Sequence, residues 1–258
     1  MKVVILAGGL GTRISEETKY KPKPMVEIGE KPIIWHIMKS YSHFGYNNFI
    51  ICAGYKQHMV KDWFFNYFMY KSDIKMNFKN KQNEFTILDS DIEPWEVSII
   101  DTGFSTMTGG RVKRIQKYVG NETFMLTYGD GVCDVNIDEI VKFHKSHGKI
   151  ATITSIIQKQ QKGVLELSKL GEVRSFREKK NGDGAPINAG FMVFEPKIFD
   201  YLKDDTTVLE AEPMERLASE GQLMSYTHRG FWQCMDSLRE KEVLEEMWDK
   251  NQAPWKLW

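Results

Sequence analysis

The chain has few cysteines, no excess of either charge and no long apolar run. Cys52, Cys133 and Cys234 are far apart, which fits neither a disulfide framework nor a zinc site with closely spaced ligands. Lysines plus arginines number 35 and equal the acidic residues, so no global positive field exists to hold nucleic acid or an anionic membrane. The N-terminal apolar run is too short for a signal peptide, and no stretch of about 18 apolar residues follows. We therefore expect reduced thiols in a soluble cytoplasmic protein that binds neither nucleic acid nor membrane.

The apolar pattern predicts an α/β fold with one core. Residues 3–6 are β-branched or aliphatic throughout, as in a strand buried on both faces, and residues 31–44 carry apolar side chains at helical spacing. A second apolar strand is expected at residues 49–54, which completes a βαβ unit and implies a parallel sheet. Further strands are predicted at 97–101, 124–128, 150–157, 190–194 and 223–227, and helices at 137–147, 210–220 and 237–249.

Two segments allow more than one interpretation. Residues 63–78 hold more aromatic side chains than one helix face can bury, which is consistent with a thick core helix or with a subunit interface. His144 and His147 share a helix face, and such a pair is usually exposed and without function. We expect no histidine to serve as a general base.

A glycine-rich turn follows the first strand. Gly8, Gly9 and Gly11 would expose backbone N–H groups to an anion. A dinucleotide-binding turn is disfavoured because Ile14 stands where its third glycine would be, and no Walker A lysine follows. Arg13 lies in the turn and Lys23 lies between two prolines, which restrict its backbone and suit it to meet a phosphate. By itself, Lys23 could equally be a solvated surface lysine.

Two aspartates are candidate metal ligands. Nucleotidyl transfer uses Mg²⁺ held by one or two carboxylates and by phosphate oxygens. Asp130 ends the strand predicted at 124–128 and lies between two glycines, although such an aspartate can also be a turn former. Asp236 precedes the helix predicted at 237–249 and could instead cap it.

Three strings resemble the signature of the sugar-1-phosphate nucleotidyltransferases. They are G-G-L-G-T-R at 8–13, K-P-K-P-M at 21–25 and V-E-I-G-E-K-P-I at 26–33. The resemblance implies a Rossmann-like, mostly parallel but mixed sheet flanked by helices, in a single domain over residues 1–258. Its nucleotide-binding part would cover about 1–130, and its sugar-phosphate-binding and C-terminal part about 131–258. It also implies Mg²⁺ on Asp130 and Asp236, and catalysis by these two residues together with Arg13 and Lys23.

Other strings resemble the members of this family that use CTP and glucose 1-phosphate. They stand at residues 15–18, 93–95, 101–111 and 253–256. The resemblance implies that Gly163, Glu178, Lys179 and Asn188 bind the sugar phosphate, although Lys162 and Lys180 depart from the usual pattern beside them. It implies nucleotide contacts by Leu6, Ala7, Gly8, Gly9, Gly11, Thr12, Arg13, Lys23, Thr106, Gly109, Arg111 and Asp130. Without the resemblance, Arg111 would be read as a solvated residue at a helix start.

The resemblance predicts an in-line attack by glucose 1-phosphate on the α-phosphorus of CTP. The products would be CDP-glucose and pyrophosphate, in nucleotide-sugar and O-antigen biosynthesis. The family is usually oligomeric, so a homo-oligomer is expected, with a hexamer as the state that the resemblance suggests. Two alternatives stay open: a transferase that prefers UTP or dTTP, and a non-catalytic sugar-nucleotide sensor or regulatory subunit that kept the fold.

Overall fold

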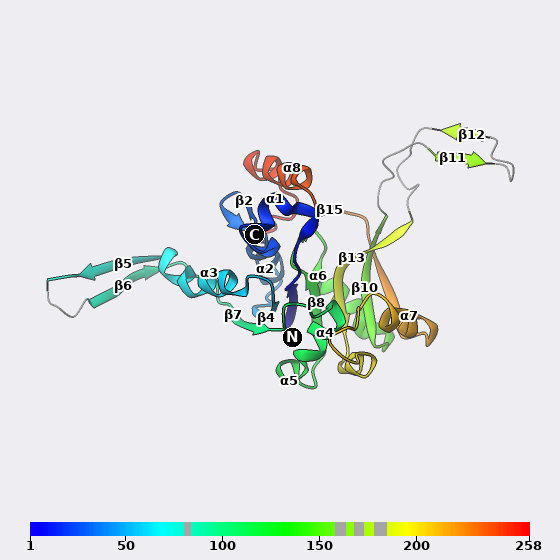
Figure 1. Ribbon diagram of the computed structural model, residues 1–258, viewed down its shortest axis with the longest axis horizontal. Helices are drawn as coiled ribbons and strands as arrows, with labels where there is room; N and C mark the ends of the chain where they lie inside the picture. The colour runs from blue at the N-terminus through cyan, green and yellow to red at the C-terminus, as the bar shows by residue number, and fades with distance from the viewer. Residues whose placement is uncertain (80–83, 158–163, 168–172, 178–184) are drawn as a thin grey trace.

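A seven-stranded mixed sheet forms the centre of the molecule (Figure 1). The computed structural model describes the chain except residues 80–83, 158–163, 168–172 and 178–184. Strands β7, β4, β1 and β8 are parallel, whereas β13 runs antiparallel between β8 and β10, and β14 is parallel to β10. The predicted α/β class is confirmed. The strands are β1 (Val3–Ala7), β4 (Asn48–Ala53), β7 (Glu96–Asp101), β8 (Phe124–Tyr128), β10 (Ala151–Ile157), β13 (Pro186–Phe194) and β14 (Leu223–His228).

Helices cover both faces of the sheet, which explains why β1 is apolar at every position. Val3 and Ile5 pack into one core with α2 (Ile33–His43), α6 (Ile137–His147) and α8 (Leu238–Asp249). Val4 and Leu6 pack into a second core on the other face. The elements on that face are α4 (Thr108–Arg114), α5 (Gln116–Val119), η3 (Pro196–Tyr201) and α7 (Glu212–Ser219). Side chains that alternate between two buried faces require a continuous apolar strand.

The aromatic segment 63–78 is not one helix, contrary to one of the two interpretations. Helix α3 (Gln57–Tyr70) ends inside it, and β5 (Ser72–Asn77) then pairs with β6 (Glu84–Ser90) in an antiparallel hairpin. The hairpin projects from the body of the molecule (Figure 1). The many aromatic side chains concealed the change from helical to strand spacing. From residue 73 onward polar and apolar residues alternate, as they do in a strand. We call residues 71–79 and 84–90 the arm.

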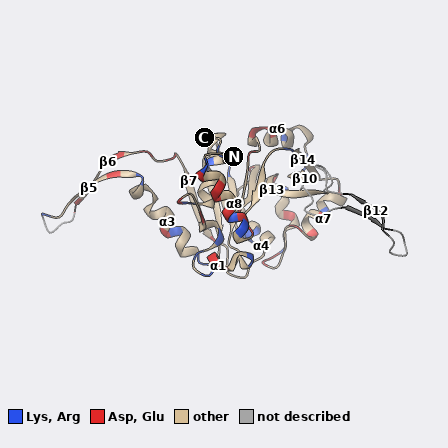
Figure 2. Cartoon of the chain, turned by 90° about the horizontal axis from the view of Figure 1, so that it is seen from above, with Lys and Arg blue, Asp and Glu red and all other residues tan. Residues whose placement is uncertain are grey.

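His144 is buried and not a surface residue as expected. Only 2% of it is exposed, its Nδ1 lies 2.8 Å from Thr152 Oγ1, and its Nε2 lies 3.1 Å from a carboxylate oxygen of Glu195. None of the three cysteines forms a disulfide: Cys52 and Cys133 are buried and Cys234 is partly buried. Basic and acidic residues are interspersed over the residues that the structure describes, without a segregated positive region (Figure 2). In the described part of the chain, no helix has both the length and the apolar character needed to span a bilayer.

Short two-stranded ribbons complete the fold. The ribbon of β9 (Gly131–Cys133) and β15 (Trp232–Cys234) joins distant parts of the chain beside the central sheet. The others are β2 (Glu27–Ile28) with β3 (Lys31–Pro32), and β11 (Val164–Leu167) with β12 (Val173–Arg177). The C-terminal segment is anchored by Trp255, which is fully buried against α2 and α8.

Candidate active site

The glycine turn follows β1 and leads into the short helices η1 (Thr12–Ile14) and α1 (Ser15–Thr18). Gly11 has φ of +66°, in the left-handed region that favours glycine. Gly8 is required for a different reason, because a Cβ there would lie 2.1 Å from Nη1 of Arg111. The turn therefore brings bare backbone to the carboxyl end of the sheet, where ligands bind in open α/β folds.

Lys23 is buried and points at two carboxylates. It begins η2 (Lys23–Met25), after Pro22 in extended conformation, and only 6% of the residue is exposed. Its Nζ donates to Asp130 Oδ2 at 2.6 Å and to Asp236 Oδ1 at 2.5 Å. Burial acts to lower the pKa of Lys23, but the two acids outweigh it and raise that pKa above its ordinary 10.5. Lys23 is thus charged and held in place, unlike a solvated surface lysine.

The β9–β15 ribbon brings the two aspartates together. Asp130 directly precedes β9, and Asp236 follows β15 by two positions. Within the ribbon, Gly131 pairs with Cys234, and the N–H of Met235 donates to the carbonyl of Asp130 at 2.8 Å. Backbone pairing between the two segments therefore fixes the separation of the two carboxylates.

Asp236 takes part in the cation cluster and does not cap α8. Ser237 is the N-cap, because its Oγ accepts from the N–H of Glu240. Oδ2 of Asp236 instead accepts from Nη1 of Arg13 at 2.6 Å. Burial acts to raise the pKa of Asp236, but Lys23 and Arg13 together hold it below its ordinary 3.8. A carboxylate that stays ionised suits a metal ligand.

A cavity of about 410 Å³ lies between the glycine turn, the end of β8 and the start of α4. Its lining includes every predicted nucleotide-binding residue except Gly109, which is buried against the backbone of Thr207. The residues of the lining that sequence reasoning missed are Pro24, Met107, Thr108, Tyr128 and Gly129. Pro24, Met107, Thr108 and Gly129 are each adjacent in sequence to a predicted residue, and Tyr128 ends the strand predicted at 124–128, so these positions were the available signal.

Arg111 lies beneath the glycine turn. Only 4% of it is exposed, and burial lowers its pKa from the ordinary 12.5. Its Nη1 donates to Gly103 O at 2.7 Å and to Thr102 Oγ1 at 2.8 Å, and its Nη2 donates to Gly8 O at 2.9 Å. The guanidinium thus joins the glycine turn to the loop that follows β7. Arg111 is therefore not a solvated residue at a helix start.

The predicted sugar-phosphate residues are only partly visible. Gly163, Glu178 and Lys179 lie outside the described residues. Asn188 lies on β13, partly buried, with Oδ1 accepting from the N–H of Gly190 at 2.9 Å. Gly190 in turn packs against the ring of Tyr128, so Asn188 is near the same cavity along the sheet.

This fold and this cluster of cations and carboxylates define a nucleotidyl transferase. The sequence profile of the family described as "Nucleotidyl transferase" matches residues 2–236, and the chain belongs to this family. It is similar over its full length to the glucose-1-phosphate cytidylyltransferase of Salmonella typhimurium, with 53% identity over 259 aligned residues and complete coverage of both chains. Identity to the probable glucose-1-phosphate cytidylyltransferase of Bacillus subtilis is 41%, again over both full lengths.

Solved structures support the same fold. HddC from Yersinia pseudotuberculosis superposes with a TM-score of 0.68 at 22% identity, covering 96% of this chain and 99% of that one. The apo form of a UDP-glucose pyrophosphorylase superposes with a TM-score of 0.69 at 17% identity, covering 97% and 98%. At these identities the likeness concerns the fold alone.

Proposed function

We propose that the protein transfers CMP from CTP to glucose 1-phosphate, forming CDP-glucose and releasing pyrophosphate. The observation that carries the reaction type is that Lys23 and Asp130, which line the cavity, meet Asp236, which contacts Lys23. The choice of substrates is supported by 53% identity over the full length to a glucose-1-phosphate cytidylyltransferase.

The donor set fits a magnesium ion. Two carboxylates from different segments converge on the single ammonium of Lys23, so both present an oxygen to one place, and Mg²⁺ prefers oxygen ligands. Asp130 and Asp236 would hold the ion, which when bound would neutralise charge on the phosphates.

The protein's own contribution would be positioning and charge. The glycine turn would present N–H groups to the triphosphate, Lys23 would balance charge at the α-phosphate, and Arg13, whose side chain is 71% exposed, would reach the outer phosphates. A phosphate oxygen of glucose 1-phosphate would attack the α-phosphorus in line, forming one P–O bond as the bond to pyrophosphate breaks. The nucleophile is already an anion at pH 7, so no protein base is needed. Gly163, Glu178, Lys179 and Asn188 would bind the sugar phosphate.

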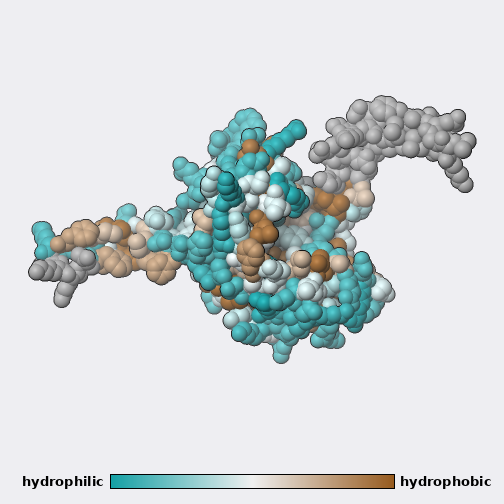
Figure 3. Space-filling model, in the orientation of Figure 1, coloured by the Kyte–Doolittle hydropathy of each residue, from teal (hydrophilic) through white to brown (hydrophobic). Residues whose placement is uncertain are grey.

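We further propose that the cytoplasmic protein is a homo-oligomer that uses α3 and the arm as contact surface. Phe65 and Tyr70 on α3 are each 77% exposed, and Phe85 and Leu88 on β6 are 57% and 65% exposed. Figure 3 shows apolar residues along the projecting arm. Monomeric proteins rarely leave such a continuous apolar surface in contact with water.

The proposed reaction is tested by pyrophosphate release with glucose 1-phosphate and Mg²⁺. CTP, UTP, dTTP, ATP and GTP are compared at equal concentration, and the nucleotide sugar is identified by mass. The proposal requires CTP to be the preferred substrate. Preference for UTP or dTTP would keep the reaction and replace the nucleotide, whereas tight CDP-glucose binding with no turnover would identify a sensor.

A further inference from the structure

Two walls of the nucleotide cavity come from β8 and from α4. Tyr128, at the end of β8, forms part of one wall, and Thr108, at the start of α4, forms part of the other. Both side chains donate to the same carboxylate. Tyr128 Oη lies 2.5 Å from Oε1 of Glu210, and Thr108 Oγ1 lies 2.6 Å from Oε2 of Glu210. Glu210 itself is not part of the lining.

The loop that carries Glu210 is itself fixed on α4. Backbone N–H groups of Met107 and Gly110 donate to the carbonyls of Asp205 and Thr207, and Thr108 Oγ1 accepts from the N–H of Leu209 at 2.9 Å. This contact needs glycine on the helix, because a Cβ at Gly110 would lie 2.6 Å from Cα of Asp205. The position of the carboxylate is therefore set by backbone contacts and not only by its own rotamer.

Tyr128 is held from its other side by β13. Gly190 has φ of +84°, and a Cβ there would lie 2.4 Å from Cδ2 of the Tyr128 ring. The ring thus fits between Gly190 and the cavity, with its hydroxyl committed to Glu210. A rotation of the ring about its Cα–Cβ bond would break that hydrogen bond and change the width of the cavity.

We propose that Glu210 is a positioning residue that sets the separation of the two walls and thereby the affinity for the nucleotide. It would act through Tyr128 and Thr108, without contacting the substrate. The inference rests on the proposed function, since it assigns this cavity to a nucleoside triphosphate. A carboxylate that bridges two hydroxyl groups restricts both, and pre-organised walls lose less conformational entropy when the ligand binds.

A double-mutant cycle tests the proposal with Tyr128→Phe, Glu210→Ala and their combination. The dissociation constant of the magnesium–nucleotide complex is measured by calorimetry in the absence of sugar phosphate, with the nucleotide that the wild-type protein uses fastest. Tyr128→Phe should weaken binding about fivefold, as expected for one lost hydrogen bond. Glu210→Ala loses two hydrogen bonds and should weaken binding at least as much, and the double variant should be no weaker than Glu210→Ala. The KM for the nucleotide should rise by a similar factor, with kcat changed less.

Nucleotide binding by the variants tests the role of Glu210, whereas turnover by the wild-type protein tests the proposed function. If wild-type turnover is normal but the single variants bind as tightly as wild type, Glu210 does not position the walls. If the two effects multiply, the Tyr128 hydroxyl acts on the nucleotide without Glu210, and the inference is equally wrong. Loss of the proposed function would instead appear as a wild-type protein without turnover.

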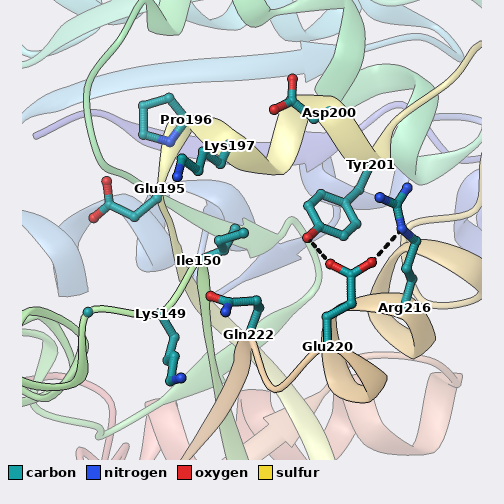
Figure 4. A pocket seen from close by; sticks show the side chains of 11 residues that line it. Lys149, Ile150, Glu195, Pro196, Lys197, Asp200, Tyr201, Arg216, Glu220 and Gln222 are labelled. Atoms are coloured by element: carbon teal, nitrogen blue, oxygen red, sulfur yellow. Dashed lines mark hydrogen bonds and ion pairs between the residues drawn. The ribbon is translucent and has the colours of Figure 1, made fainter.

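Two further variants separate positioning from general stability. Glu210→Gln keeps an acceptor of the same shape and should recover most of the affinity lost in Glu210→Ala. Tyr201→Phe removes a hydroxyl from a comparable pair, because Tyr201 Oη donates to Glu220 Oε2 at 2.5 Å (Figure 4). This pair lies beside the residues that precede β10 and β14, away from the nucleotide cavity. Tyr201→Phe should leave the dissociation constant and the KM for the nucleotide unchanged. If it weakened nucleotide binding as much as Tyr128→Phe does, the effect would not be specific to the cavity walls, and the proposal would be wrong.

Discussion

The ammonium of Lys23 lies 2.5 Å from Oδ1 of Asp236, although 213 positions separate the two residues. The same Nζ lies 2.6 Å from Asp130, so one cation is shared by two carboxylates that would otherwise repel each other. A divalent ion placed between the carboxylates would compensate the same charge. Lys23 and the proposed metal site are therefore linked electrostatically, and this link gives the first two predictions.

Asp130→Asn and Asp236→Asn should each abolish turnover, because an amide oxygen is a poorer ligand for Mg²⁺ than a carboxylate. We expect at least about a hundredfold loss of pyrophosphate release. Circular dichroism and thermal unfolding should show a folded protein. Asp249→Asn, at the exposed end of α8, is the matched control and should be fully active. Substantial activity in either active-site variant would exclude that residue as an essential ligand.

Lys23→Met should destabilise the protein in the absence of metal, since two partly buried carboxylates lose their shared partner. We expect a loss of about 2 kcal/mol in the free energy of unfolding. Mg²⁺ should restore part of it, because an ion bound only by the folded state stabilises that state. The measurement is thermal unfolding with EDTA and with Mg²⁺. The control is Lys145→Met, at an exposed position of α6. An unchanged unfolding temperature in EDTA would contradict the proposed charge balance.

Much of the fold and part of the site could be predicted because local sequence determines them. Strand β8 and helix α6 have the predicted bounds, since a buried strand and an amphipathic helix follow from the period of apolar residues. The glycine turn, Arg13 and Lys23 could be found because each belongs to a short motif of neighbouring residues. What failed was non-local. The burial of His144 and the bridge from Glu210 to Tyr128 depend on segments that meet only in the folded chain. The β5–β6 hairpin is local, and it was missed because the aromatic side chains of residues 63–78 concealed the change from helical to strand spacing.

Arg111→Lys should weaken both stability and nucleotide binding. A guanidinium donates through a planar fork to several acceptors, whereas the ammonium of lysine has a different shape and reach. Gly8, Thr102 and Gly103 would lose donors at buried positions, with an expected cost of about 2 kcal/mol. Urea unfolding and calorimetry with the nucleotide measure the two effects. Arg216→Lys, at an exposed ion pair with Glu220, serves as the comparison. Wild-type behaviour of Arg111→Lys would mean that these hydrogen bonds are dispensable.

His36 should make the protein less stable in mild acid. Burial lowers the pKa of His36 from 6.5 to about 4, although hydrogen bonds to backbone carbonyls act in the opposite direction. Below pH 6.5 His36 binds a proton in the unfolded chain but stays neutral in the folded protein. The free energy of unfolding therefore falls as the pH decreases to about 4, where the folded protein also binds the proton and the loss levels off. The shift corresponds to about 3 kcal/mol. His36→Gln should flatten this pH dependence in urea unfolding, whereas exposed His43→Gln should not. Equal slopes for the wild-type and His36→Gln proteins would contradict the assignment.

Replacing apolar residues of the arm should dissociate the proposed oligomer. Phe85→Asp with Leu88→Asp introduces two charges on exposed positions of β6, where they cost little in the isolated chain but must be desolvated in a subunit contact. Sedimentation velocity at micromolar concentration should show a wild-type oligomer and a smaller species for the double variant, with unchanged circular dichroism. Tyr118→Asp, an exposed aromatic residue on α5, should leave the oligomer intact. A monomeric wild-type protein would refute the arm as a contact surface, because the exposed residues of α3 and β6 would then remain in contact with water.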